Sequence, residues 1–159
     1  MLSLILATIA CGIGATALLD LWAILLNRTA GIALPNWAMV GRWFGHLPSG
    51  TFFHDDIGKA APVPDELALG WIMHYAVGIL FAAILVDVAG PGWLAAPAFL
   101  PAWILGIVTV GCGWFILQPG MGAGWAASRR PNAMQIRMLN LVGHTVFAIG
   151  LYGTALLIK

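Results

Sequence analysis

The stretch LSLILATIACGIGATALLDLWAILL, residues 2–26, holds one charged residue, Asp20. A transmembrane helix needs roughly 20 mostly apolar residues, because the hydrocarbon core of a bilayer is about 30 Å thick. This stretch is therefore long enough to span a membrane. It is also too long for the apolar part of a cleaved signal peptide, and no basic residue precedes it, so we expect it to remain as the first span.

Three further apolar runs of similar length follow the first one, over residues 67–86, 98–117 and 138–158. Only 8% of the 159 residues are charged and 61% are hydrophobic, whereas soluble domains carry about 25% charged residues. The runs are continuous, unlike the short alternating segments of a membrane β-barrel. We predict an all-α polytopic membrane protein, with residues 1–159 forming a single four-transmembrane-helix bundle.

The basic residues indicate the orientation of the spans. Six of the seven Lys and Arg residues lie in the loops after the first and third runs, namely Arg28, Arg42, Lys59, Arg129, Arg130 and Arg137. The loop between the second and third runs has none. Since basic loops stay in the cytoplasm, we expect both of these loops to be cytoplasmic and both termini to be periplasmic.

Three ionisable residues interrupt the predicted spans: Asp20, His74 and His144. Each lies about 10 Å from the cytoplasmic end of its helix, so we expect them at one depth. Thr109 and Cys112 fall at the corresponding depth of the third run, with Gln118 nearer its end. Ionisable groups in hydrocarbon are costly and indicate function by default.

Helical spacing extends these positions into stripes of small and polar residues that we expect to face the bundle interior. The stripes are Gly12, Thr16 and Asp20; Gly70, His74 and Gly78; and Asn140 with His144. One interpretation is a functional site for a ligand, a proton or a metal, with His74 and His144 as metal ligands. The other is a purely structural hydrogen bond between helices. The two cysteines, Cys11 and Cys112, match no metal motif and are interpreted as small core residues.

The first cytoplasmic loop contains an amphipathic segment, residues 37–47, which we expect to lie in the membrane interface or to be re-entrant. Arg42 and His46 lie off its apolar face. His54 and Asp55 follow, and these four residues are a candidate lid over the site. His46 and His54 match no standard metal spacing, so a solvated loop is favoured unless the loop folds over the bundle.

The second cytoplasmic loop begins QPGMGAG at residues 118–124 and continues to Arg129 and Arg130. Glycine-rich backbone beside arginines is able to form an anion-binding nest. The spacing is not that of a dinucleotide fingerprint. A flexible turn with topological positive charge explains most of the pattern.

Several segments together resemble a known family. They are GATALLDLW at 14–22, VGRWFGHLPSG at 40–50 through His54 and Asp55, LGWIMHY at 69–75, and QPGMGAG at 118–124. The chain resembles, over nearly its whole length, the small bacterial membrane proteins classed as domain of unknown function 2938. The resemblance implies a bacterial inner-membrane location and transfers no catalytic role.

Three functions follow as hypotheses. The first is a ligand-binding or transport-type protein with a polar site in the cytoplasmic half of the bundle, built by Asp20, His74 and His144. The second is a membrane oxidoreductase in which neutral imidazoles hold a metal or haem. The third is an accessory subunit or assembly factor of a larger membrane complex. No cofactor is identified by the residues. The bilayer is the expected partner, a homo-oligomer stays open, and a net charge of +1 gives no reason to expect nucleic-acid binding.

Overall fold

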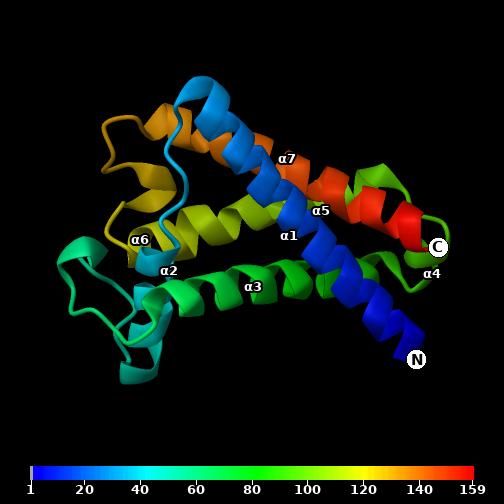
Figure 1. Cartoon of the computed structure of the whole chain (residues 1–159), viewed down its shortest axis with the longest axis horizontal. Helices are drawn as coiled ribbons and strands as arrows, with labels where there is room; N and C mark the ends of the chain where they lie inside the picture. The colour runs from blue at the N-terminus through cyan, green and yellow to red at the C-terminus, as the bar shows by residue number, and fades with distance from the viewer. Residues whose placement is uncertain (1) are drawn as a thin grey trace. The chain divides into compact units, whose positions relative to one another are not determined.

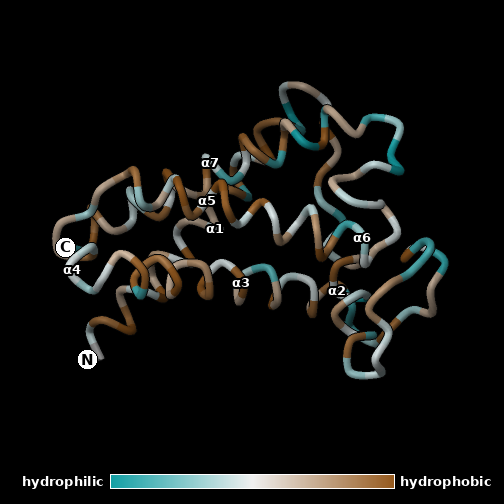
Figure 2. Tube along the Cα trace, turned by 180° about the vertical axis from the view of Figure 1, so that it is seen from behind, coloured by the Kyte–Doolittle hydropathy of each residue, from teal (hydrophilic) through white to brown (hydrophobic). Residues whose placement is uncertain are grey.

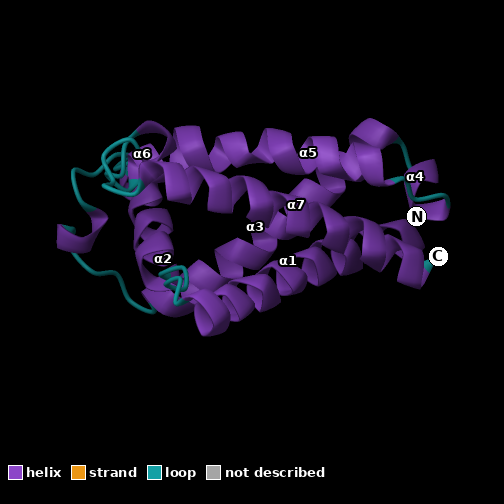
Figure 3. Ribbon diagram, turned by 90° about the horizontal axis from the view of Figure 1, so that it is seen from above, coloured by secondary structure: helices purple, strands orange, loops and turns teal. Residues whose placement is uncertain are grey.

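The computed structural model describes residues 2–159, with side chains from residue 3 onward. Four long helices dominate it: α1 (Leu2–Ala30), α3 (Glu66–Ala89), α5 (Phe99–Cys112) and α7 (Ala133–Ile158) (Figure 1). A π-helical turn, η3 (Gly113–Leu117), and the short α6 (Gln118–Gly120) prolong α5. The remaining elements are α2 (Trp37–His46), η1 (Leu47–Ser49), η2 (Ile57–Lys59), α4 (Gly92–Ala95) and η4 (Trp125–Ala127). No strand occurs within the described residues (Figure 3).

The predicted all-α class is confirmed, and four helical segments are long and apolar enough to cross a membrane: Ser3–Ala30, Glu66–Ala89, Phe99–Gly120 and Ala133–Ile158. The helices extend beyond the predicted apolar runs. The last one begins at Ala133 and not near Met138. Hydropathy marks where a chain prefers lipid, whereas a helix also includes polar residues that flank the apolar run. The start of α7 at Ala133 comes two residues after Pro131, a residue type that breaks helices.

The backbone contacts divide the chain into two compact units. Unit 1 comprises the residues up to Leu34 together with Tyr75–Thr109 and Leu141–Lys159. Unit 2 comprises Pro35–His74 and Val110–Asn140. Unit 2 contains most of both loops that are predicted to be cytoplasmic, whereas Arg28 lies at the end of α1 in unit 1. Figure 2 shows that hydrophilic residues are frequent in these loops, while the long helices are mostly apolar.

Glycine and threonine allow α1 and α3 to approach closely in unit 1. A Cβ on Gly12 would lie 2.5 Å from the Cα of Ile79, and a Cβ on Gly78 would collide with the Thr16 hydroxyl. Thr16 is 1% exposed, and its hydroxyl donates to the Gly12 carbonyl at 2.8 Å. The predicted interior position of these stripe residues is confirmed.

The core of unit 1 joins α1, α3 and α7. Its largest fully buried side chains include Leu85 and Leu151, which pack in one cluster with Cys11. Cys11 therefore packs in the core as expected. For Cys112 this expectation is wrong, because its side chain is exposed at the end of α5. The start of α1 and the end of α7 lie at the same end of this unit as α4 (Figures 1 and 3).

Unit 2 is organised around α2, which confirms the predicted helical segment after the first span. The Asn36 side chain caps the helix by accepting from the Met39 amide at 3.3 Å. Gly41 lies against the backbone of Glu66 and Gly70 at the start of α3, with no room for a Cβ. Left-handed Gly50, with φ 79°, follows η1 and ends the helical segment.

Candidate functional site

The two loops of unit 2 hydrogen-bond to each other. The His54 amide donates to the Gly120 carbonyl at 3.0 Å, and the Ile57 amide donates to the Met121 carbonyl at 3.2 Å. Gly122, with φ 87°, approaches the Asp55 carbonyl so closely that a Cβ would collide with it. The first loop thus folds onto the glycine-rich segment that follows α5 and its π-helical extension.

Trp43 secures the same junction from α2. Its indole Nε1 donates to the Phe52 carbonyl at 2.9 Å, and its ring lies where a Cβ on Gly120 would be. The side chain is 6% exposed. The hydrogen bond to the carbonyl offsets the free-energy cost of removing the indole N–H from water. Trp43 therefore holds the first loop against the second.

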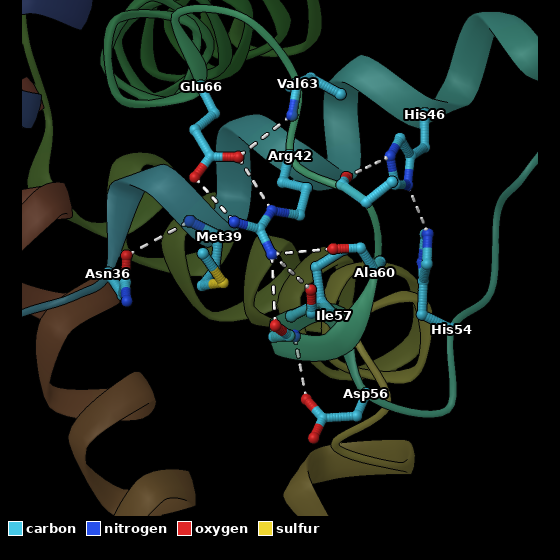
Figure 4. A network of polar contacts seen from close by, with 12 residues as sticks. Asn36, Met39, Arg42, His46, His54, Asp56, Ile57, Ala60, Val63 and Glu66 are labelled. Carbon is cyan, nitrogen blue, oxygen red and sulfur yellow. Dashed lines mark hydrogen bonds and ion pairs between the residues drawn. The ribbon is translucent and has the colours of Figure 1, made fainter.

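His46 and His54 meet across the first loop (Figure 4). His46 Nδ1 lies 2.8 Å from His54 Nε2. The outer nitrogen of each ring lies 2.9 Å from a carbonyl oxygen: Ala61 for His46 Nε2 and Gly120 for His54 Nδ1. All four ring nitrogens of the pair are therefore engaged. Most of the loop between the two histidines is exposed, as the solvated interpretation expects, although the two rings themselves are half-buried against each other.

Arg42 is held in a second network beside this pair (Figure 4). Its guanidinium forms a bidentate ion pair with Glu66, and Nη1 donates to the carbonyls of Ile57, Gly58 and Ala60 at 3.0–3.3 Å. The Arg42 residue is 9% exposed. The hydrogen bond to the Glu66 carboxylate raises the pKa of Arg42 above its ordinary value. In this structure Arg42 binds the loop backbone, and its role toward a ligand stays a prediction.

A cavity of about 290 Å³ opens beside His54. Its charged lining residues are Asp55 and Arg129, and Phe53 and Trp125 contribute aromatic rings. Both charged side chains are exposed. Small-molecule sites are usually lined mostly by apolar side chains, whereas polar surface predominates in this cavity, and its volume is just below the usual range.

Backbone contacts fix the position of Arg129 at this cavity. Its amide donates to the Ala123 carbonyl at 2.9 Å, and Gly124, with φ 76°, packs directly against its side-chain stem. Ala126 and Ala127 adopt left-handed conformations, with φ 47° and 59°. Such strain in residues other than glycine costs about 1–3 kcal/mol each and is concentrated at functional sites. The Arg137 side chain supports this turn by donating to the Ala126 carbonyl at 2.8 Å.

Gln118 lies in a third polar group, formed with α7 at the π-helical turn. The Asn140 Oδ1 atom accepts from Trp114 Nε1 and from Gln118 Nε2, each at 3.0 Å. The Gln118 Oε1 atom is buried without a partner in the described residues. π-Helical turns often accompany functional sites, and an unmet buried acceptor is costly, so Gln118 is placed to accept from a water or ligand donor.

Asp20 and His144 are both in unit 1. Asp20 Oδ2 accepts from the Tyr75 hydroxyl at 3.0 Å, which joins α1 to α3. His144 Nδ1 donates to the Gly106 carbonyl at 2.9 Å and lies 3.2 Å from the Thr109 hydroxyl. The contact places His144 and Thr109 at one level of their two helices, as expected, while their depth in a membrane stays a prediction.

His74 belongs to unit 2, where its ring stacks on Trp37 with centroids 3.9 Å apart. Trp71 meets the same imidazole edge-on at 5.9 Å. Their participation, with Asp20 and His144, in one ligand site stays a prediction. Across residues 2–159 no group of three or more His, Cys, Asp or Glu side chains is arranged to hold a metal ion.

Sequence reasoning grouped His46, His54 and Asp55 in one candidate lid but predicted neither the direct contact of the two histidines nor the cavity that His54 and Asp55 line with Arg129. Arg129 was considered as a topological charge and as part of a glycine-rich nest, and Phe53 and Trp125 were not considered as site residues. The available signal was the pair of glycines at 122 and 124, since both have positive φ and permit close backbone approach.

Comparison with known proteins gives a family but no activity. No curated protein and no solved structure gave a significant match. A family model described as a protein of unknown function (DUF2938) matches residues 9–158. The match covers nearly the whole chain and includes every residue of the cavity and of the histidine pair. The chain belongs to the family of proteins of unknown function DUF2938.

Proposed function

We propose that this protein spans the bacterial inner membrane and binds a small polar ligand with an anionic group, as a transport-type protein. The observation that carries the proposal is the cavity beside His54, which Arg129 lines together with Phe53 and Trp125. Within the described residues, the Arg129 side chain forms no hydrogen bond or ion pair. A guanidinium whose N–H donors have no protein partner in a concave site is suited to bind a carboxylate or a phosphate.

Asp55 supports a ligand that is more than a simple anion. Its carboxylate lines the same cavity as Arg129. A molecule with both an anionic and a donor group would satisfy both side chains, while Trp125 and Phe53 cover its apolar part. This reasoning moves the proposed site from the interior of the spans to the loops of unit 2.

The loop contacts also support the proposed orientation. Segments that hydrogen-bond to each other, as His54 does with Gly120, lie on one side of a bilayer. These are the segments that follow the first and third apolar runs and carry most of the basic residues. The positive-inside rule then assigns them to the cytoplasm, with both termini periplasmic.

Ligand-dependent thermal stability of the purified protein tests the proposal. Inorganic phosphate, acetate and glycine are the probes, because they separate a phosphate, a carboxylate and a zwitterion. A probe at a hundredfold excess over its Kd adds about 2.7 kcal/mol of stability. We expect this gain for at least one probe in the wild type and in Arg130→Ala, whose side chain is outside the cavity lining, and its loss in Arg129→Ala. Equal gains in all three proteins, or none in the wild type, contradict the proposal.

A second candidate function, a membrane oxidoreductase in which a neutral imidazole holds a metal or haem, is supported by His144. Its Nδ1–H donates to the Gly106 carbonyl, so the neutral ring has its lone pair on Nε2. A backbone carbonyl that fixes the tautomer in this way is typical of metal-ligating histidines. Absorbance and elemental analysis of protein from its native membrane test this function. If that sample shows no Soret band and contains no stoichiometric metal, this function is falsified.

A further inference from the structure

The contact between His46 and His54 has more hydrogen-bond positions than two neutral rings have protons. A neutral imidazole carries one N–H and one lone pair. Carbonyl oxygens only accept, so the bonds to Ala61 and Gly120 each require a ring N–H. His46 Nε2 and His54 Nδ1 are thereby protonated, and both neutral rings have used their single proton.

The two nitrogens that face each other are then both lone pairs. They are His46 Nδ1 and His54 Nε2, and they lie 2.8 Å apart. Two lone pairs at that distance repel, whereas one proton between them makes an N–H···N hydrogen bond of ordinary length. The geometry therefore requires three protons on two rings.

A metal ion fits this gap less well than a proton. Zn²⁺ binds imidazole nitrogen at 2.0–2.1 Å, so two nitrogens of a tetrahedral site lie about 3.3 Å apart. The observed separation is 2.8 Å. In addition, no third His, Cys, Asp or Glu side chain in the described part of the chain completes a metal site with the pair.

The charges around the pair are compatible with one added positive charge. Glu66 is near enough to His46 to interact with it electrostatically, and Arg42 is bonded to that same carboxylate. On the side of the cavity, His54 is accompanied by Asp55 and Arg129. Asp56 forms a separate exposed ion pair with Lys59 at 3.8 Å. Two carboxylates thus accompany the pair: Glu66 interacts with His46, and Asp55 lines the cavity with His54.

We propose that His46 and His54 form a proton-binding site that holds one proton between His46 Nδ1 and His54 Nε2. The pair is a single cation, and its excess proton lies next to the cavity because His54 is also a cavity wall. This inference goes beyond the proposed function, and each can fail while the other holds. A proton held in this position is available for exchange with whatever enters the cavity.

Nitrogen NMR of the full-length protein in detergent micelles, labelled with ¹⁵N-histidine and measured at pH 7, tests the site. We expect two fully protonated ring nitrogens, bonded to the carbonyls, and two with intermediate shifts that share one proton. A scalar coupling across the N–H···N bond would identify that proton in the wild type without any variant. Two facing nitrogens with the shifts of free lone pairs would overturn the proposal.

Two variants separate the shared proton from the carbonyl bonds. His46→Gln keeps a donor toward Ala61, and His54→Asn keeps a donor toward Gly120, but each removes one facing nitrogen. We expect either variant to abolish the shared-proton signal, while His144→Asn leaves it unchanged. Stoichiometric zinc in the purified wild type, lost in both loop variants, would overturn the proposal in favour of a metal site.

Discussion

Arg42 and Glu66 are joined by two hydrogen bonds, Nε to Oε2 at 2.8 Å and Nη2 to Oε1 at 2.9 Å, although 24 positions separate them in the chain. The same guanidinium reaches three backbone carbonyls between residues 57 and 60. One side chain therefore ties α2 to the start of α3 and orders the loop between them.

Replacing Arg42 with lysine removes the planar fork that allows these contacts. Lysine keeps the charge but cannot bind the carboxylate bidentately while reaching the carbonyls. We expect Arg42→Lys to lower the thermal unfolding temperature by several degrees and to increase proteolysis of the first loop. Arg130→Lys is the control, because Arg130 is exposed. Equal behaviour of the two variants would contradict the role of the fork.

The contact of Gly122 with Asp55 predicts the cost of a methyl group there. An alanine would adopt φ near 87° and collide with the Asp55 carbonyl. We expect Gly122→Ala to destabilise the protein by about 2 kcal/mol or more, since left-handed strain alone costs 1–3 kcal/mol. Denaturant or thermal unfolding measures the loss. The matched change is Gly153→Ala in α7, where the new methyl group meets nothing within 4 Å; a similar loss there would remove the argument.

Close packing of α1 on α3 makes Gly12 intolerant of substitution. The Cβ of an alanine would lie 2.5 Å from the Cα of Ile79, and backbone cannot move aside as a flexible side chain can. We expect Gly12→Ala to destabilise unit 1 by about 1–3 kcal/mol through overpacking. Unfolding in detergent micelles measures the effect. No change relative to the wild type would show that these helices are further apart in the membrane.

His144 is predicted to act through its Nδ1 donor. The asparagine side chain has an N–H at a position equivalent to Nδ1, whereas the leucine side chain has no hydrogen-bond donor. We expect His144→Asn to retain wild-type stability and His144→Leu to lose about 0.6 kcal/mol, the average for an interhelical hydrogen bond in a membrane protein. If both variants fold but lose bound metal or haem, the second candidate function is favoured and the purely structural role is not.

Orientation is tested by thiol labelling in a background without Cys11 and Cys112. Ser49 and Ser128 are exposed in the two loops of unit 2, and Gly92 is exposed in α4. We expect a membrane-impermeant reagent to label Ser49→Cys and Ser128→Cys only in everted vesicles and Gly92→Cys only in intact cells. Labelling of the two serine positions from opposite sides would contradict the loop contacts.

Much of the fold could be read from local pattern. The four apolar runs predict the four long helices because preference for lipid depends on composition over about 20 residues. The α2 segment was found from its periodicity, and the depth of His144 relative to Thr109 followed from helical rise alone. Burial of Thr16 and Gly78 followed from their spacing. Each of these inferences needs only the geometry of a single helix.

The loop site could not be read in this way. The bond between His54 and Gly120 joins residues 66 positions apart, and nothing in their local sequence indicates the pairing. His46 and His54 face each other only because the chain turns between them and is held by Trp43 and Arg42. The two histidines are eight residues apart, which matches no standard metal-binding spacing, so the sequence favoured a solvated loop.

The sequence alone determined that this chain is helical, apolar enough for a membrane and divided into long apolar helices and loops, because these properties depend on the composition and periodicity of short segments. Only the tertiary structure decided which polar groups meet. It placed Arg129 at a cavity with Asp55, and His46 against His54. Those contacts depend on glycines that permit close backbone approach and on hydrogen bonds between distant loops, whose energies arise only once the chain has folded.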